Sequence, residues 1–332
     1  MVGLGISGIV DGQRSPRVGG CQANTLTRDV TAVHTLLVIV FSSAVTQPQV
    51  YRACAQPGIE RAREPGSVVY SPAAAGSISE SYNHLLDVAG ARDDLEALVL
   101  VHQDAEIASP DLCATVRRAL ADPDVGVIGC AGAVGVRSIA WWEGSVTLSS
   151  FANRYVEHGG CDLPGLSWDW EDAPPYARPG EVEALDGFVL VLSPWVVRNL
   201  RFDESLSPFH GYDLDFCLQA RVAGRKVMTA DFRAIHHRPL EMVPDVEEWV
   251  DAHVRVAEKW EEAMPNIGAA AGTWKQRARR AEAQADAARA LAHARRLELA
   301  ARTTYLERAL HEANQSLSWR ITAPLRMLAR TR

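Results

Sequence analysis

Short apolar runs alternate with helix-like segments along the chain from about residue 36 to residue 239. The strand-like runs lie at 36–41, 67–72, 95–102, 125–130, within 183–200, and at 226–239. Segments with the three- and four-residue apolar spacing of helices lie at 77–90, 109–123 and 210–224. This alternation predicts an α/β fold with a mixed, mostly parallel sheet flanked by helices.

Residues 137–180 interrupt this rhythm. The stretch is rich in tryptophan and proline, and loops of such length are usually either functional or disordered. Its tryptophans are Trp141, Trp142, Trp168 and Trp170. We therefore treat it as an insertion into the α/β pattern, either packed on itself or used for binding.

The chain becomes helical from about residue 245, and from residue 274 it is rich in Ala, Arg and Glu. Leu299, Leu306 and Leu310 have the partial spacing of a coiled coil, and Arg289 and Arg296 interrupt the same stripe. We predict a helical or coiled-coil extension at the C-terminal end. The resulting division is a disordered leader at 1–32, a globular domain at 33–245 and the extension at 246–332.

The net charge of −7 conceals an asymmetry. Residues 271–332 carry 13 basic and 5 acidic side chains, which leaves 21 basic and 36 acidic side chains for the preceding part of the chain. An acidic body argues against a nucleic-acid groove. The basic tail is instead predicted to contact an anionic membrane surface or a coiled-coil partner, or to be a frayed end.

The six cysteines are widely spaced and form no CxxC pair, which favours reduced, mostly buried thiols in a cytosolic protein. No apolar run approaches the roughly 18 residues that a membrane span needs. We therefore expect a cytoplasmic protein, with the basic tail as the segment that would reach the inner face of a membrane.

A polar cluster, His102-Gln103-Asp104, ends the apolar run at 95–102. In open α/β sheets, ligands bind outside the carboxyl ends of the strands. A carboxylate at this edge can hold a divalent cation that bridges phosphates. Taken alone, Asp104 fits a cap of the turn before Ser109 better than it fits a metal ligand.

Two further clusters lie near the ends of predicted elements. Asp213 and Asp215 stand at the start of the helix at 210–224, and residues two apart cannot share one helix face. Asp213 is placed to project into a cleft, and Asp215 to stabilise the helix N-terminus. His236 and His237 close the last strand, where adjacent side chains point to opposite sides, so that at most one of them faces a given site.

These clusters, in this order, resemble the family 2 inverting glycosyltransferases of the GT-A fold, a Rossmann-like α/β fold, over about residues 35–240. The resemblance is greatest to a branch with His-Gln-Asp at the usual Asp-x-Asp position. Other matching stretches are Ser81-Tyr82-Asn83, Gly187-Phe188, the "fDE" loop Phe202-Asp203-Glu204, and the "EDxD" helix Tyr212-Asp213-Leu214-Asp215 with its closing Gly224.

The resemblance implies transfer of a sugar from a nucleoside-diphosphate sugar to a hydroxyl group of a saccharide or lipid-linked acceptor, with inversion. Mn²⁺ or Mg²⁺ held by Asp104 and His236 would offset the charge of the departing diphosphate. Asp213 would be the general base. Residues assigned to the nucleotide and cofactor are Ser42, Asn83, His102, Gln103 and Asp104. Residues assigned to substrate are Trp141, Trp142, Gly187 and Tyr212.

Two departures from the family pattern leave an alternative open. His102 stands where a carboxylate is usual, and Tyr212 stands where a glutamate is usual. Both would suit a catalytically impaired scaffold or binding subunit. Asp104, Asp213 and a strand-end histidine are retained, which favours an enzyme, and cell-surface polysaccharide or glycoconjugate synthesis is the setting that the family implies.

Overall fold

The computed structural model describes residues 37–136, 138–141, 146–149, 151–155, 161–162, 179–238, 245–260 and 273–315. The predicted leader at 1–32, Trp142, Trp168, Trp170 and the basic segment after residue 315 lie outside the described residues. Within the part that is described, no helix is both long enough and apolar enough to cross a membrane.

A six-stranded sheet with the order β12-β5-β11-β3-β1-β2 forms the centre of the fold. Its strands are β1 (Val38–Ser42), β2 (Val68–Tyr70), β3 (Leu95–Val101), β5 (Val125–Gly129), β11 (Val189–Leu192) and β12 (Lys226–Thr229). Strand β11 runs antiparallel to β3 and β5, whereas the other neighbouring pairs are parallel. The predicted mixed, mostly parallel sheet is confirmed.

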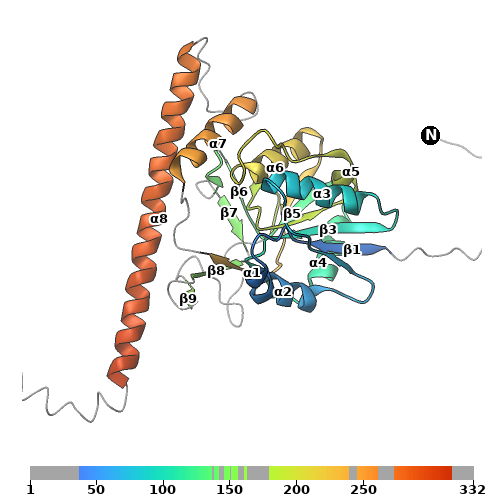
Figure 1. Ribbon diagram of the computed structural model, residues 1–332, viewed down its shortest axis with the longest axis horizontal. Helices are drawn as coiled ribbons and strands as arrows, with labels where there is room; N and C mark the ends of the chain where they lie inside the picture. The colour runs from blue at the N-terminus through green and yellow to red at the C-terminus, as the bar shows by residue number, and fades with distance from the viewer. Residues whose placement is uncertain are drawn as a thin grey trace, which may run out of the picture. The chain divides into compact units, whose positions relative to one another are not determined.

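Helices cover both faces of this sheet (Figure 1). One face carries α2 (Ala55–Ala62) and α4 (Leu112–Leu120), and the other carries α3 (Ile78–Gly90), α5 (Pro194–Asn199) and α6 (Tyr212–Val222). In β3, Val99 and Val101 pack in the core of the first face, and Leu98 and Leu100 in the core of the second. This double burial explains why the strand is a continuous apolar run.

Two smaller sheets flank the central one. They have the orders β10-β6-β7 and β4-β13-β8-β9. Their strands are β4 (Ala105–Ile107), β6 (Ala131–Val134), β7 (Val146–Ser149), β8 (Phe151–Tyr155), β9 (Cys161–Asp162), β10 (Ala184–Leu185) and β13 (Ala234–Arg238). The insertion at 137–180 thus supplies strands β7, β8 and β9, and the single strand predicted at 226–239 is divided into β12 and β13.

Two helices follow β13. Helix α7 (Val246–Lys259) buries Trp249, Val250 and Val256 in the same core cluster as the central sheet. Helix α8 (Thr273–Gln315) has 43 residues and contacts α7. The predicted C-terminal helix is present. Because α7 shares the main core, the predicted division at residue 245 separates two segments that pack together.

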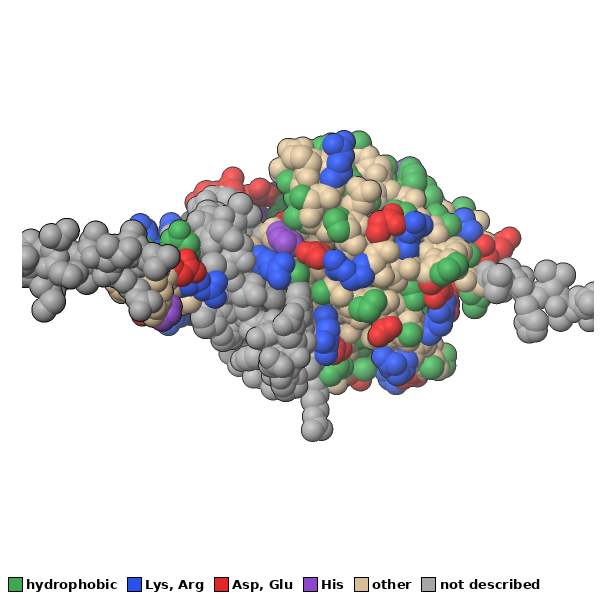
Figure 2. Space-filling model, turned by 90° about the horizontal axis from the view of Figure 1, so that it is seen from below, with side chains coloured by type: hydrophobic (Ala, Val, Ile, Leu, Met, Phe, Trp, Pro, Cys, Tyr) green, Lys and Arg blue, Asp and Glu red, His purple; other side chains and the backbone are tan. Residues whose placement is uncertain are grey.

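The described residues form an apolar interior and a surface that carries charges of both signs. Cys54, Cys113, Cys130 and Cys217 are buried free thiols, as predicted. On the face seen in Figure 2, basic and acidic side chains are interspersed. Several of the basic side chains are paired, and Arg117, for example, contacts Glu96 at 2.8 Å and also contacts Glu64.

Candidate active site

The His102–Asp104 turn connects β3 of the central sheet to β4 of a smaller one. The Ala105 N–H donates to the His102 carbonyl at 3.0 Å, which closes the turn. Strand β13 lies antiparallel to β4, with His236 opposite Ala105, and the His237 N–H donates to the Asp104 carbonyl at 2.8 Å. This pairing brings a histidine from the end of the α/β region beside the strand-end carboxylate.

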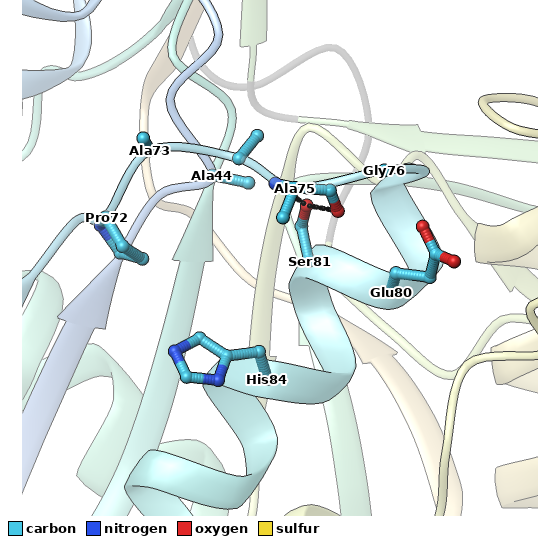
Figure 3. A pocket seen from close by; sticks show the side chains of 9 residues that line it. Ala44, Pro72, Ala73, Ala75, Gly76, Glu80, Ser81 and His84 are labelled. Atoms are coloured by element: carbon cyan, nitrogen blue, oxygen red, sulfur yellow. Dashed lines mark hydrogen bonds between the residues drawn. The ribbon is translucent and has the colours of Figure 1, made fainter.

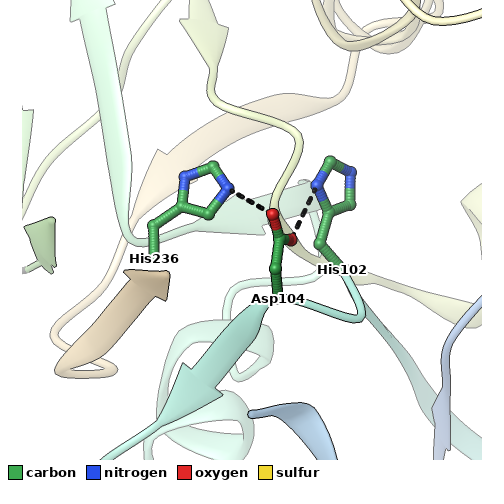
Figure 4. Close-up of side chains that lie close together, drawn as sticks. All are labelled: His102, Asp104 and His236. Atoms are coloured by element: carbon green, nitrogen blue, oxygen red, sulfur yellow. Dashed lines mark ion pairs between the residues drawn. The ribbon is translucent and has the colours of Figure 1, made fainter. Parts of the chain in front are cut away.

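His102, Asp104 and His236 converge on one point (Figure 4). His236 Nε2 lies 3.6 Å from Asp104 Oδ2, and His102 Nδ1 lies 3.9 Å from Asp104 Oδ1. One potential ligand atom from each residue lies within 4.8 Å of the others. Both nitrogen–oxygen separations exceed ordinary hydrogen-bond lengths, so the three side chains face a shared space as ion-pair contacts (Figure 4).

The orientation of His102 is set by Tyr212. The His102 Nε2 atom lies 2.7 Å from the Tyr212 hydroxyl, and donation from Nε2–H would leave the Nδ1 lone pair facing Asp104. Burial lowers the pKa of His102, which favours the neutral imidazole that a metal requires. Tyr212 is itself buried, and Gly187 makes room for it, because a Cβ at Gly187 would lie 2.1 Å from the Tyr212 hydroxyl oxygen.

His236 is held by stacking. Its ring lies parallel to that of Phe188, with centroids 4.6 Å apart and an interplanar angle of 8°. The His236 Nδ1 atom is buried and has no hydrogen-bond partner among the described residues. Burial favours the neutral form of Asp104, but His236 and His102 outweigh it and hold the Asp104 pKa well below its usual range.

His237 faces away from this cluster. Its Nε2 atom lies 3.0 Å from Glu106 Oε2, and Glu106 also pairs with Arg61 at 3.1 Å. The alternation of side chains along β13 therefore resolves the choice between the two histidines that the sequence leaves open. His236 lies with Asp104, and His237 belongs to an ion-pair network on the other side of the strand.

Asp213 lies in the first turn of α6, immediately after Tyr212. Its Oδ2 accepts a hydrogen bond from the Gly187 N–H at 3.1 Å, and its Oδ1 accepts one from the Leu214 N–H at 2.9 Å. Burial, and next the charge of Asp186, raise the pKa of Asp213 to about 7. A carboxyl group with such a pKa is half ionised near neutral pH, which is suited to proton transfer.

Asp215, two residues further on, has no exposed surface. Its carboxylate accepts hydrogen bonds from Gln219 Nε2 and Trp260 Nε1, each at 2.7 Å, and pairs with Lys259 Nζ at 2.7 Å. Lys259 also bonds Asp203 at 2.6 Å, so the end of α7 is tied to α6 and to the loop before it. Sequence reasoning missed Lys259 and Trp260 because they lie outside every recognised motif.

Two of the residues assigned to the nucleotide hold loops together. The Gln103 amide oxygen accepts the N–H groups of Thr46 and Gln47, at 2.9 and 2.8 Å, and its NH₂ donates to the Thr46 hydroxyl. The Asn83 amide bonds the Phe202 N–H and carbonyl, each at 2.9 Å, and Glu204 at 2.7 Å. These amides are used in positioning the segments around the cluster.

The other predicted residues differ in their exposure. Ser42 ends β1, and its hydroxyl is buried without a hydrogen-bond partner among the described residues. Trp141 is 6% exposed and packs in the core, so its ring offers no open stacking face. Phe209, which the sequence did not single out for binding, is instead 52% exposed, with its ring centroid 6.0 Å from that of His102.

A cavity of about 460 Å³ lies beyond the carboxyl ends of β1 and β2 (Figure 3). Small residues form much of its wall, and Ser81, Glu80 and His84 of α3 provide its polar side chains. His84 Nε2 lies 3.0 Å from the Tyr70 hydroxyl. Because β1 and β3 are parallel neighbours, the cavity and the His102–Asp104 turn lie at the same edge of the sheet.

Comparison with known proteins identifies the family. The model of the "Glycosyltransferase like family" matches residues 41–238, more than half of the chain. The chain therefore belongs to this glycosyltransferase-like family. The matched range contains His102, Asp104, Asp213 and His236, and it ends before α7.

Three individual proteins are similar to this chain, each at 30% sequence identity or less. The chain is 30% identical over 183 residues to the streptomycin biosynthesis protein StrF of Streptomyces griseus, covering 54% of this chain and 59% of that protein's length. The mannosyltransferase PcManGT of Pyrobaculum calidifontis, solved with GDP-Man and Mn²⁺, has 14% identity and a TM-score of 0.43, covering 86% of this chain and 82% of that one. A197 from STIV has 11% identity and a TM-score of 0.39, covering 61% and 86%.

Proposed function

We propose that this protein is a metal-dependent inverting glycosyltransferase that moves a sugar from a nucleoside diphosphate to a hydroxyl acceptor. The observation that carries the proposal is the convergence of His102, Asp104 and His236 at the carboxyl end of β3. Family membership supplies the reaction class. Asp213 adds the proton acceptor. Its carboxylate accepts a hydrogen bond from the Gly187 N–H, and the next residue, Phe188, carries the ring that stacks on His236.

The three side chains fit one divalent cation. They offer two imidazole nitrogens and one carboxylate oxygen, all partly buried. This donor set suits Mn²⁺ better than Mg²⁺, which prefers oxygen ligands and retained water. A cation bound there would offset the negative charge that develops on the leaving diphosphate. We therefore include His102 among the ligands, beside Asp104 and His236.

Asp213 is the general base in this proposal. Its carboxylate takes the proton of the acceptor hydroxyl as the acceptor oxygen bonds to the anomeric carbon. In the same displacement the bond from that carbon to the diphosphate oxygen breaks, and the electron pair leaves with the diphosphate. Attack opposite the leaving group inverts the anomeric configuration. The hydrogen bond from the Gly187 N–H fixes the direction of the carboxylate.

The remaining parts of the substrates can be assigned by position. The cavity beside β1 and β2 would hold the nucleoside against the polar side chains of α3, and Ser42, Gln103 and Asn83 lie outside its lining. Phe209, exposed next to His102, would stack on an acceptor sugar, a role for which Trp141 is too deeply buried.

Because α7 completes the core, the catalytic domain in this proposal extends to Trp260. Synthesis of cell-surface polysaccharide or glycoconjugate is the proposed setting.

A panel of nucleoside-diphosphate sugars tests the function. We expect at least one of them to raise the melting temperature in the presence of Mn²⁺, since a ligand that binds only the folded state stabilises it. The same donor should be hydrolysed or transferred, and Asp104→Asn should lose the Mn²⁺-dependent part of the shift. Binding without hydrolysis or transfer would support the scaffold alternative, and no binding by any donor would overturn both.

A further inference from the structure

Helix α8 has apolar positions on two opposite sides. Leu297, Ala301 and Thr304 recur at helical spacing and are buried or half-buried, on a helix that contacts α7. At 100° per residue, Leu306 and Leu310 point to the opposite side, and they are 57% and 60% exposed. Packing on α7 therefore leaves a second apolar stripe, marked by Leu306 and Leu310, on the exposed side of α8.

This second stripe has heptad spacing. Leu299, which is 64% exposed, and Leu306 are seven residues apart and occupy one core position, d. Thr303 and Leu310 occupy the other, a. The two preceding a positions are arginines, so the apolar seam begins near Leu299 and covers the C-terminal half of the helix.

The charged side chains that flank the seam would attract each other in a parallel pair of α8 helices but not in an antiparallel pair. In this register Arg302 takes position g and Glu307 takes position e, five residues later. In a parallel, in-register pair of helices, g of one helix faces the following e of the other. Arg302 of each copy would then face Glu307 of the second copy. In an antiparallel pair g faces g, and those positions carry Arg295, Arg302 and Ala309, which offer no opposite charge.

We propose that α8 pairs with α8 of a second copy of this chain as a parallel, in-register coiled coil along Leu299–Leu310. The occupant is a second copy because the seam is apolar and its flanking charges complement each other across a two-fold axis. Glu307 beside the leucines disfavours an anionic membrane surface, because such a surface repels a carboxylate. This proposal is independent of the proposed reaction.

Cross-linking at the seam tests the contact in the full chain. Leu306→Cys should form a disulfide-linked dimer under mild oxidation, because equivalent d positions meet in a parallel pair. His311→Cys is the matched control, since His311 is exposed at position b, and it should stay monomeric on the denaturing gel. The unaltered chain controls for the native cysteines. Equal cross-linking of both variants, or none at position 306, would overturn the proposal.

Charge reversal tests the register. Arg302→Glu and Glu307→Arg should each weaken dimerisation about tenfold in sedimentation, since each creates two like-charge pairs. The double variant restores opposite charges and should return to within about twofold of the unaltered chain. A double variant weaker than either single one would exclude the parallel register. A chain that stays monomeric at all concentrations, or that binds anionic vesicles through Leu306, would exclude the second copy as the occupant.

Discussion

Asp213 and Asp215 are the same residue type, lie in the same turn of α6 and are two residues apart, yet their surroundings are opposite. Burial, and next the like charge of Asp186, raise the pKa of Asp213 to about 7, although two backbone N–H groups bond its carboxylate. Asp215 meets Lys259 and two neutral donors that together compensate its buried charge. A buried carboxyl group without a neighbouring cation has a raised pKa and is suited to proton transfer. A buried carboxylate whose charge is compensated instead holds neighbouring segments together.

The largest effect should come from removing the general base that we propose, Asp213. Asp213→Asn should lower turnover about 10²–10⁴-fold, because the amide cannot take a proton from the acceptor hydroxyl. Steady-state kinetics and donor affinity, measured on the same preparation, would separate this loss from a loss of binding. Asp215→Asn is the comparison, and it should lower the melting temperature while the folded fraction keeps measurable turnover. Full turnover in Asp213→Asn would remove Asp213 from the mechanism.

The second prediction removes the cation from Asp215. Lys259→Met should destabilise the protein by about 3 kcal/mol, since it leaves a buried carboxylate without its counter-charge. Urea unfolding measures the change. Lys226→Met is the control, because Lys226 pairs with Asp122 on the exposed surface and its loss should cost much less. If both substitutions lowered the free energy of unfolding equally, the Lys259–Asp215 pair would not be what holds α7 against α6.

The third prediction concerns the support of His102. Tyr212→Phe removes the hydroxyl that orients the ring and should weaken Mn²⁺ binding about tenfold, as loss of a hydrogen bond to a ligating histidine usually does. Calorimetric titration with Mn²⁺ gives the affinity. Tyr70→Phe, which removes the hydroxyl near His84, should leave it unchanged. An unaltered affinity in Tyr212→Phe would argue against His102 as a ligand.

The last prediction concerns pH. Because the folded-state pKa of Asp213 is raised from 3.8 to about 7, ionisation favours the unfolded state as pH rises through this window. Asp213→Asn should therefore match the unaltered chain below pH 4 and be more stable above pH 7, by up to about 4 kcal/mol. Unfolding at several pH values measures the difference.

The rate of transfer should fall as pH drops below about 7, and Asp186→Asn should move this fall in rate to lower pH. A stability difference that does not vary with pH would contradict the assignment.

The sequence alone predicts the alternation of strands and helices, the polar turn at the end of β3 and the order of the acids and histidines. These are local properties, because apolar periodicity and strand-end residues depend on a few neighbours along the chain. They sufficed to predict the mixed sheet and to nominate Asp104, Asp213 and His236.

Contacts between distant segments fix which of these groups share a site and what surrounds each of them. The register of β13 against β4 selects His236 over His237, and Tyr212 turns His102 toward Asp104. The contrast between Asp213 and Asp215 depends on Lys259 of α7, more than 40 residues away along the chain. Burial and charge pairing arise where segments far apart in the chain meet, and no local pattern encodes such contacts.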